Sequence, residues 1–253
     1  MLIDDLKSFT YDAYIKFLKL LKQNFRIVPF CEATEGAGSF LILRHDVDAS
    51  LEAALKMAKM EHELGIRSTY FVLFSYKFYN LLERDDLNTL REISKLGHEI
   101  GLHYDTVTYE SYGQDLRETL ETEIGLLRRI LGRKIFSIAR HNVSLMTGED
   151  PFKDIEGYIN AYDPELCRNY VSDSCRSWFL KDLTRLLEFN YRKVQLLIHP
   201  LLWTEDFCER DAVLERLFQG IERKNNDYKQ MWLEVWHKNP KVKEYDRLVE
   251  GDK

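Results

Sequence analysis

The sequence Phe40-Leu-Ile-Leu-Arg-His-Asp-Val-Asp48 decides the fold class of this chain. Its first four residues are apolar without polar alternation, and they follow the turn-forming residues Gly36-Ala-Gly-Ser39. Such a run is typical of a strand that is buried on both faces, as in the parallel sheet of an α/β protein. One arginine, one histidine and two aspartates then stand at its carboxyl end, the edge where α/β folds bind ligands.

Asp46 and Asp48 are two residues apart, so on an extended chain their side chains point the same way. Two neighbouring carboxylates repel each other unless a cation lies between them or one of them is protonated. A helix cap is a simpler explanation, because Asp48-Ala-Ser50 precedes a helical pattern. A cap needs only one aspartate, however, and leaves Arg44, His45 and Asp46 unexplained.

Composition limits the classes of protein to which the chain can belong. Its 253 residues are 45% hydrophobic and 13% aromatic, enough for one α/β domain of barrel size. A net charge of -6 argues against nucleic acid as the main partner. Because no apolar run reaches the length of a membrane span and Met1-Leu-Ile-Asp-Asp5 does not begin a signal peptide, we expect a cytoplasmic protein that is not integral to a membrane. The four scattered cysteines predict neither disulfides nor a cysteine-based zinc site.

Strand-like and helix-like segments alternate about seven times along the chain. An amphipathic helix with Thr10 as its cap is expected first. Strands are then predicted at 40–48, 68–74, 98–104, 134–139, 158–161, 170–172 and 193–199, and helices at 51–64, 87–96, 115–131, 211–221 and 232–236. The alternation predicts an α/β fold, either a (β/α) barrel or a doubly wound sheet, and no repeat or linker marks a second domain.

Chemically active residues recur where the predicted strands end. They are Asp46, Asp48, Arg140 and Asp173, with four of the seven histidines, His45, His103, His141 and His199. Carboxylates and imidazoles that converge from several strands are the ligand set of a divalent transition metal. A catalytic zinc site keeps three protein ligands and an open position for water. His98 stands at the opposite end of its predicted strand from His103, and we expect it to be structural.

The order of these motifs resembles the polysaccharide deacetylase family, the NodB homology domain of carbohydrate esterase family 4. Five segments between about residues 40 and 203 carry the resemblance: Arg44-His-Asp-Val-Asp48, Gly97-His-Glu-Ile-Gly-Leu-His103, Ala139-Arg-His-Asn142, Ser172-Asp-Ser-Cys-Arg-Ser-Trp178 and Leu196-Leu-Ile-His-Pro200. The resemblance implies a distorted (β/α)7 barrel in a single domain over residues 1–253. Residues 1–35 would be a helical extension, 40–203 the barrel with the motifs, and 204–253 C-terminal helices.

The resemblance also implies roles for individual residues. Asp46 would be the general base, Asp48 and His103 ligands of a divalent metal, expected to be zinc, and His199 the general acid. Arg140 would orient Asp46, and Asp173 would pair with Arg140 or tune His199.

One position departs from the family pattern. A second histidine usually follows four residues after the first in the second motif, but that position is Val107 here. Our candidate for the third metal ligand is His141, with Asp105 as the second choice. If neither residue binds, the site would hold metal weakly or not at all, as in allantoinase-like relatives. A hydrogen-bonding loop residue is the alternative role for His141.

The expected function is metal-dependent removal of an acetyl or formyl group from an N-acylated sugar. In the cytoplasm the substrate would be a nucleotide-linked or lipid-linked precursor, or an oligosaccharide, in the synthesis of a surface polysaccharide such as O-antigen or lipopolysaccharide. Four aromatic residues near the strand ends could stack on a sugar ring: Tyr104, Tyr109, Trp178 and Trp203. Trp178 and Trp203 could equally belong to the core. Two alternatives remain, an allantoinase-like hydrolase of a small-molecule amide and a catalytically silent carbohydrate-binding domain.

Overall fold

The computed structural model describes residues 5–33, 39–74, 76–113, 115–141, 149–174, 176–188, 191–239 and 241. Its contacts divide the chain into two compact units, Met1–Cys208 and Glu209–Lys253. The single-domain organisation therefore stays a prediction.

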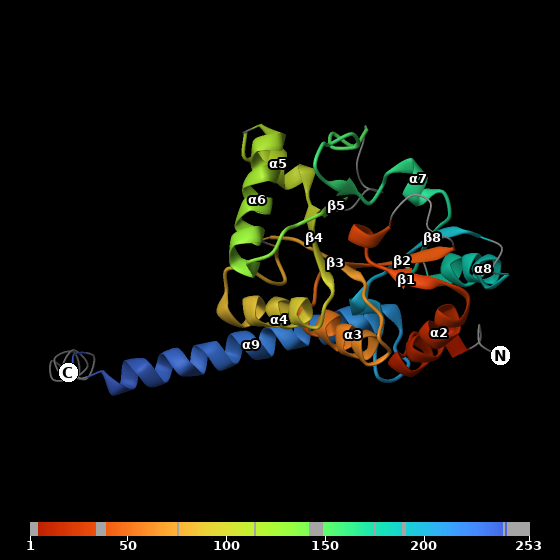
Figure 1. Cartoon of the computed structure of the whole chain (residues 1–253). Coiled ribbons are helices and arrows are strands. Elements are labelled where there is room, and N and C mark those ends of the chain that lie inside the picture. The colour runs from red at the N-terminus through yellow and green to blue at the C-terminus, as the bar shows by residue number, and fades with distance from the viewer. Residues whose placement is uncertain are drawn as a thin grey trace. The chain divides into compact units, whose positions relative to one another are not determined.

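The first unit is built on one parallel sheet (Figure 1). Its strands are β1 (Arg26–Val28), β2 (Phe40–Val47), β3 (Thr69–Val72), β4 (Glu99–Tyr104), β5 (Ser137–Arg140), β6 (Ile159–Asn160), β7 (Tyr170–Ser172) and β8 (Lys193–Ile198). Their order across the sheet is β6-β5-β4-β3-β2-β8-β7, and β1 pairs with β2 outside this path. Among the described residues no ladder joins β6 to β7, so the sheet is an open, curled barrel. This arrangement confirms the predicted α/β fold and agrees with a distorted (β/α)7 barrel.

Helices follow most of the strands and lie along the outside of the curled sheet (Figure 1). They are α2 (Tyr11–Asn24), α3 (Leu51–Glu63), α4 (Arg84–Lys95), α5 (Thr106–Ser111), α6 (Leu116–Leu131), α7 (Pro164–Cys167) and α8 (Arg176–Leu187), with short 3₁₀ turns η1 (Phe30–Glu32) and η3 (Pro200–Leu202). The predicted cap is confirmed, since Thr10 Oγ1 accepts a hydrogen bond from Ala13 N. Helices α5, α7 and α8 and strand β1 were not predicted.

Three apolar clusters hold the sheet and its helices together. The largest joins α3, α4 and α6 to β3 and β4, with Ile93, Ile124 and Leu102 fully buried. A second joins α2 and α8 to β2 and β8. A third lies on the inner face of the curl, where Phe71 and Ala139 belong to strands β3 and β5. The sheet is therefore covered on both faces, which explains the continuous apolar run of β2.

The second unit contains α9 (Arg210–Lys238), one continuous helix where the sequence predicted two. The residues between the two predicted segments include Asn225, Asn226 and Asp227, which are weak helix formers. None of them is a proline, and only proline would exclude the helical backbone. Across the described parts of the chain, no helix combines the length and the apolar character needed to cross a membrane.

Candidate active site

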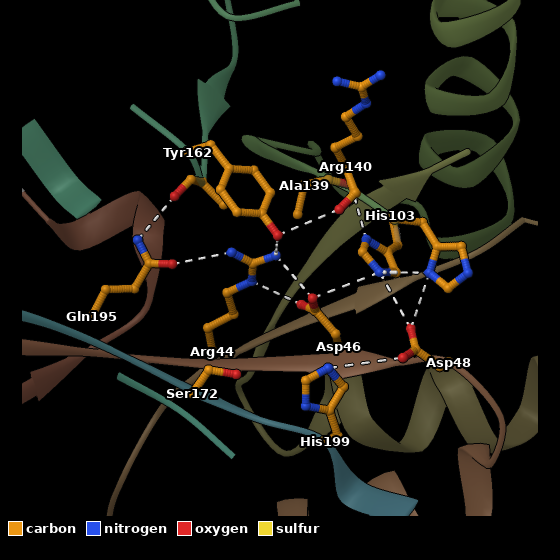
Figure 2. Close-up of polar contacts among 12 residues, drawn as sticks. Arg44, Asp46, Asp48, His103, Ala139, Arg140, Tyr162, Ser172, Gln195 and His199 are labelled. Carbon is orange, nitrogen blue, oxygen red and sulfur yellow. Dashed lines mark hydrogen bonds and ion pairs between the residues drawn. The ribbon is translucent and has the colours of Figure 1, made fainter. Parts of the chain in front are cut away.

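The carboxyl edge of the sheet brings together six of the seven predicted site residues, all except Arg140; Figure 2 labels Asp46, Asp48, His103 and His199 among them. Arg44, Asp46 and Asp48 alternate along β2 and its end and share one face, as the period of two in a strand requires. His103 comes from β4, and His141 follows β5 directly. His199 follows β8. The parallel ladders of β2, β3, β4, β5 and β8 set these side chains at one edge.

Asp48, His103 and His141 form a candidate metal site. Asp48 Oδ1 lies 3.3 Å from His103 Nε2 and 3.2 Å from His141 Nδ1. The two ring nitrogens are 3.1 Å apart. Tetrahedral zinc with bonds of about 2.0–2.1 Å separates its ligand atoms by about 3.3 Å, so the three atoms fit such an ion with little movement.

Hydrogen bonds orient the ligand atoms of this site. His103 Nδ1 lies 2.9 Å from the carbonyl oxygen of Ala139, which can only accept, so a neutral His103 ring presents the lone pair of Nε2 to the site. Asp48 Oδ1 is buried and receives no hydrogen bond of good geometry from the described residues. A buried acceptor without a hydrogen-bond partner is costly, and a cation among these three atoms would satisfy it.

Asp105, the second choice for the third metal ligand, is the N-cap of helix α5. Its carboxylate caps α5, accepting hydrogen bonds from Val107 N at 3.1 Å and Thr108 Oγ1 at 2.8 Å. Val107 itself is 60% exposed on that helix. His141, the first choice from the sequence, is the residue that lies beside Asp48 and His103.

Asp46 is held by Arg44. Arg44 Nε donates to Asp46 Oδ1 and Nη2 donates to Oδ2, both at 2.8 Å, and both residues are buried. Burial favours the neutral carboxyl, but the Arg44 guanidinium outweighs it and keeps the pKa of Asp46 below its ordinary value. Asp46 Oδ2 lies 3.6 Å from His103 Nε2. An ionised carboxylate thus stands beside the candidate metal site.

Two further side chains, those of Gln195 and Tyr162, accept hydrogen bonds from Arg44. Its Nη1 donates to Gln195 Oε1 at 3.1 Å and its Nη2 to Tyr162 Oη at 3.0 Å. The guanidinium carbon lies 4.6 Å from the ring centre of Tyr162 and 5.3 Å from that of Phe71. These contacts leave Arg44 one orientation, which fixes both oxygens of Asp46.

Arg140 does not orient Asp46, contrary to the expectation from the motif resemblance. Its Nη2 donates to Thr106 Oγ1 at 3.3 Å, and Figure 2 shows its guanidinium pointing away from Asp46. The physical reason is the register of β5. Ala139 faces the inside of the curl, so Arg140 takes the opposite face together with Ile138.

His199 is held by Asp173. His199 Nδ1 lies 2.6 Å from Asp173 Oδ1, and the backbone N of His199 donates to the same carboxylate at 3.0 Å. Trp203 Nε1 donates to Asp173 Oδ2 at 2.9 Å. Burial lowers the pKa of His199, but the Asp173 carboxylate outweighs it and raises the pKa to about 9. Of the two roles considered for Asp173, the structure shows the pairing with His199, whose Nε2 lies 3.8 Å from Asp48 Oδ2.

His45 lies on the opposite face of β2 and takes no part in the site. Its Nε2 is 2.8 Å from Glu61 Oε1, and its ring stacks on Tyr70 with the centres 4.3 Å apart. His98 belongs to the same buried cluster, where its Nδ1 accepts a hydrogen bond from Ser68 N at 3.2 Å. Both histidines connect the sheet to α3 rather than to the rim.

The aromatic residues expected to stack on a sugar are buried. Tyr104, Tyr109 and Trp203 are each exposed by at most 1%. Tyr104 Oη donates to Asp150 Oδ1 at 2.6 Å, and Tyr109 Oη bonds to Glu123. These three residues are core, and a sugar would not reach them. Asn142 and the side chain of Trp178 lie outside the described residues.

Sequence reasoning missed the roles of Arg44, Tyr162 and Gln195. A signal for Arg44 was present, because it stands two residues before Asp46 and therefore shares its strand face. Tyr162 and Gln195 carried no such signal. They reach Arg44 through sheet pairing between distant segments, which no local pattern reports.

No family model matches the chain, and no curated protein matches it significantly. A comparison of folds does find solved structures. One is a family CE4 pseudoenzyme from Bacillus anthracis, with 14% identity and a TM-score of 0.46 over 71% of this chain and 60% of that chain. The chain therefore spans about three fifths of the length of that protein.

Two further structures are deacetylases. A chitin deacetylase from the fungal pathogen Colletotrichum lindemuthianum has 15% identity and a TM-score of 0.45 over 78% of this chain and 86% of that chain. A peptidoglycan deacetylase from Bacillus subtilis has 13% identity and a TM-score of 0.44 over 79% of this chain and 100% of that chain. These three structures are thus one pseudoenzyme described as a CE4 family member and two deacetylases.

Proposed function

We propose that this protein is a metal-dependent N-deacylase of an N-acylated sugar. The observation that carries the proposal is the arrangement around Asp48, His103 and His141. A carboxylate, Asp46, and an imidazole, His199, flank this three-residue ligand set, and each is held by a buried partner of opposite charge. A binding domain has no need of a held base and a held acid beside a metal site.

The ligand set of one carboxylate and two imidazoles suits zinc, and we propose zinc as the metal. Bound there, zinc would lower the pKa of water towards about 7 and polarise an amide carbonyl. The other chemical tasks fall to residues of the chain itself.

We propose Asp46 as the general base. It is ionised because Arg44 keeps its pKa low, and its Oδ2 faces the ligand set. Arg44 donates to both oxygens, which fixes the direction of the remaining lone pairs. Asp46 would accept the proton of the attacking water in that fixed geometry.

We propose His199 as the general acid. Asp173 occupies its Nδ1, so Nε2 is the atom that faces Asp48 and the site. With a pKa of about 9 in this structure, the ring carries a proton at neutral pH. His199 would donate that proton from Nε2 to the amine nitrogen as the C–N bond breaks.

The substrate class rests on the motif resemblance. We propose an N-acetylated or N-formylated sugar that is linked to a nucleotide or lipid, or an oligosaccharide, used in the synthesis of a surface polysaccharide in the cytoplasm.

The test is release of acetate or formate from a panel of N-acylated sugars by the zinc-loaded protein. The panel includes free, nucleotide-linked and lipid-linked amino sugars and short oligosaccharides. We expect Asp46→Asn and His199→Gln each to lower kcat by about 10² or more, because each removes a general acid or base. Exposed Asp206→Asn is the matched control.

Other results would contradict the proposal. If the folded, zinc-loaded protein releases no acid from any N-acylated sugar but hydrolyses cyclic or linear small-molecule amides, the allantoinase-like alternative holds. If the protein hydrolyses no amide, and if the wild type and Asp46→Asn bind sugars equally well, the protein is a carbohydrate-binding domain.

A further inference from the structure

Helix α9 carries a regular apolar seam along its whole length. Apolar residues recur at alternating spacings of four and three, with one polar residue in the middle: Leu214, Phe218, Ile221, Asn225, Tyr228, Trp232 and Val235. This is the a/d pattern of a coiled coil, with Phe218, Asn225 and Trp232 at a positions. A pattern kept over three heptads distinguishes a coiled-coil helix from an ordinary surface helix.

The seam is exposed to solvent. Leu214, Phe218, Tyr228, Trp232 and Val235 are each exposed by 43% to 59%. Such a contiguous row of large apolar side chains marks an interaction surface. The 29 residues of α9 correspond to about 43 Å of helix, long enough for a stable helix pair.

We propose that this seam pairs with the same seam of a second copy of the chain, as an antiparallel coiled coil. The inference is independent of the proposed function. In an antiparallel pair an a residue of one helix lies level with a d residue of the other. If Asn225 lies level with Tyr228 of the second copy, Ile221 meets Trp232 and Phe218 meets Val235.

The polar layer explains why the register is unique. Asn225 and Tyr228 flank the two-fold axis, so their amide and hydroxyl groups face each other twice at the centre. A single polar residue at an a position specifies register in coiled coils at some cost in stability. Any shift along the helix would bury the Asn225 amide against apolar side chains.

Charges beside the seam favour the antiparallel direction. In this register Glu222 of one copy lies beside Lys229 of the other, and the pair occurs twice by symmetry. In a parallel pair Lys224 would instead lie beside Lys229, which repels. In a parallel pair the only attractive contact between charges beside the seam would join Arg210 to Glu215, near the end of the seam.

A membrane surface is a different occupant for an amphipathic helix with tryptophans. Residues 210–238 contain six Lys or Arg and five Asp or Glu, so the helix is close to neutral and has little attraction to anionic lipid. Asn225 in the centre of the apolar face also opposes insertion. A second copy of the chain can pair with a nearly neutral helix that has Asn225 at its centre. A lipid surface would be attracted weakly by the charge and opposed by Asn225.

The test is sedimentation velocity of the full chain and its charge variants. We expect a dimer for the wild type. Glu222→Lys and Lys229→Glu should each raise the dimer dissociation constant about tenfold, because two attractive pairs become repulsive. The double variant, which exchanges the two charges, should restore the wild-type constant. Glu234→Lys, the same chemical change outside the seam, should leave it unchanged, and circular dichroism checks that the helix persists in every variant.

Three results would overturn the inference. The wild type could stay monomeric up to about 100 µM, a concentration at which a stable coiled coil is dimeric. Lys229→Glu could tighten the dimer, which would indicate the parallel direction through Lys224. The monomer could co-sediment with vesicles of phosphatidylcholine and phosphatidylglycerol, which would make the seam a membrane-binding face.

Discussion

Arg44 is the residue that most directly controls the proposed base. It is fully buried, and it donates to both oxygens of Asp46 while Gln195 and Tyr162 hold its other nitrogens. Lysine would keep the charge but could not donate in the bidentate geometry. The position of Asp46 would then no longer be fixed.

We therefore expect Arg44→Lys to lower kcat about hundredfold, as a misplacement of about 1 Å does. Arg140→Lys should lower it far less, because Arg140 bonds to Thr106 and not to Asp46. Steady-state kinetics on the N-acylated sugar that is turned over, with unfolding curves to show that both variants fold, make the comparison. A larger loss for Arg140→Lys would restore the role that the motif resemblance assigned to it.

The difference between these two arginines shows which parts of the site a sequence can predict. Asp48, His103 and His141 were predicted because each ends a strand, and parallel strands end at one edge. Arg140 also ends a strand, but β5 is buried on both faces, so its sequence does not reveal which face each residue takes. That face is set by the pairing of β5 with β4, a contact between distant segments.

Gly101 in β4 has no room for a side chain. A Cβ at this position would lie 2.4 Å from Phe71 Cε1 and 2.9 Å from Ser137 Oγ. We expect Gly101→Ala to lower the free energy of unfolding by about 1–3 kcal/mol, the usual cost of overpacking. Gly125→Ala in α6, where the added methyl group meets nothing within 4 Å, should instead raise it by up to about 1 kcal/mol. Urea unfolding measures both changes, and equal effects would mean that Phe71 moves aside freely.

At the scale of elements, local patterns predicted most helices and strands, and distant contacts set the others. Apolar runs and the Thr10 cap are local signals, and the elements they predicted are present. Helix α5 has six residues and is organised by the Asp105 cap, so it offers too short a pattern to detect. Strand β1 has three residues and exists because it pairs with β2.

Helices α5 and α6 are linked by a carboxyl group that titrates near neutral pH. Tyr109 bonds to Glu123, and burial raises the pKa of Glu123 to about 7, with a further contribution from Asp105. The unfolded chain has the ordinary pKa of about 4.5 for this group. Its contribution to stability is therefore complete below pH 4.5 and is lost as the pH rises towards 7.

We expect the free energy of unfolding of the wild type, relative to that of Glu123→Gln, to decline between about pH 4.5 and pH 7 and to be level above that range. Urea unfolding at a series of pH values measures the difference. Glu118→Gln, an exposed change on the same helix, controls for the loss of a charge. A difference that rises with pH would show that Glu123 is ionised in the folded protein.

At the scale of the whole molecule, the candidate metal site connects strands that are far apart in sequence. Asp48 follows β2, His103 belongs to β4 and His141 follows β5. A metal that binds only the folded chain stabilises it by mass action. We expect zinc at about 100 times its dissociation constant to stabilise the fold by about 2.7 kcal/mol and to raise Tm, and a chelator to reverse the shift. Differential scanning calorimetry measures it, and a Tm that zinc does not change would argue against a site formed by folding.

The most direct test of the account is the zinc content of the purified protein by elemental analysis, beside His141→Ala and the matched control His237→Ala on α9. If Asp48, His103 and His141 hold zinc, we expect about one zinc per chain in the wild type and in the control, and a large loss in His141→Ala. Wild-type protein that is folded but remains free of metal after incubation with zinc would contradict it, and so would full zinc content in His141→Ala.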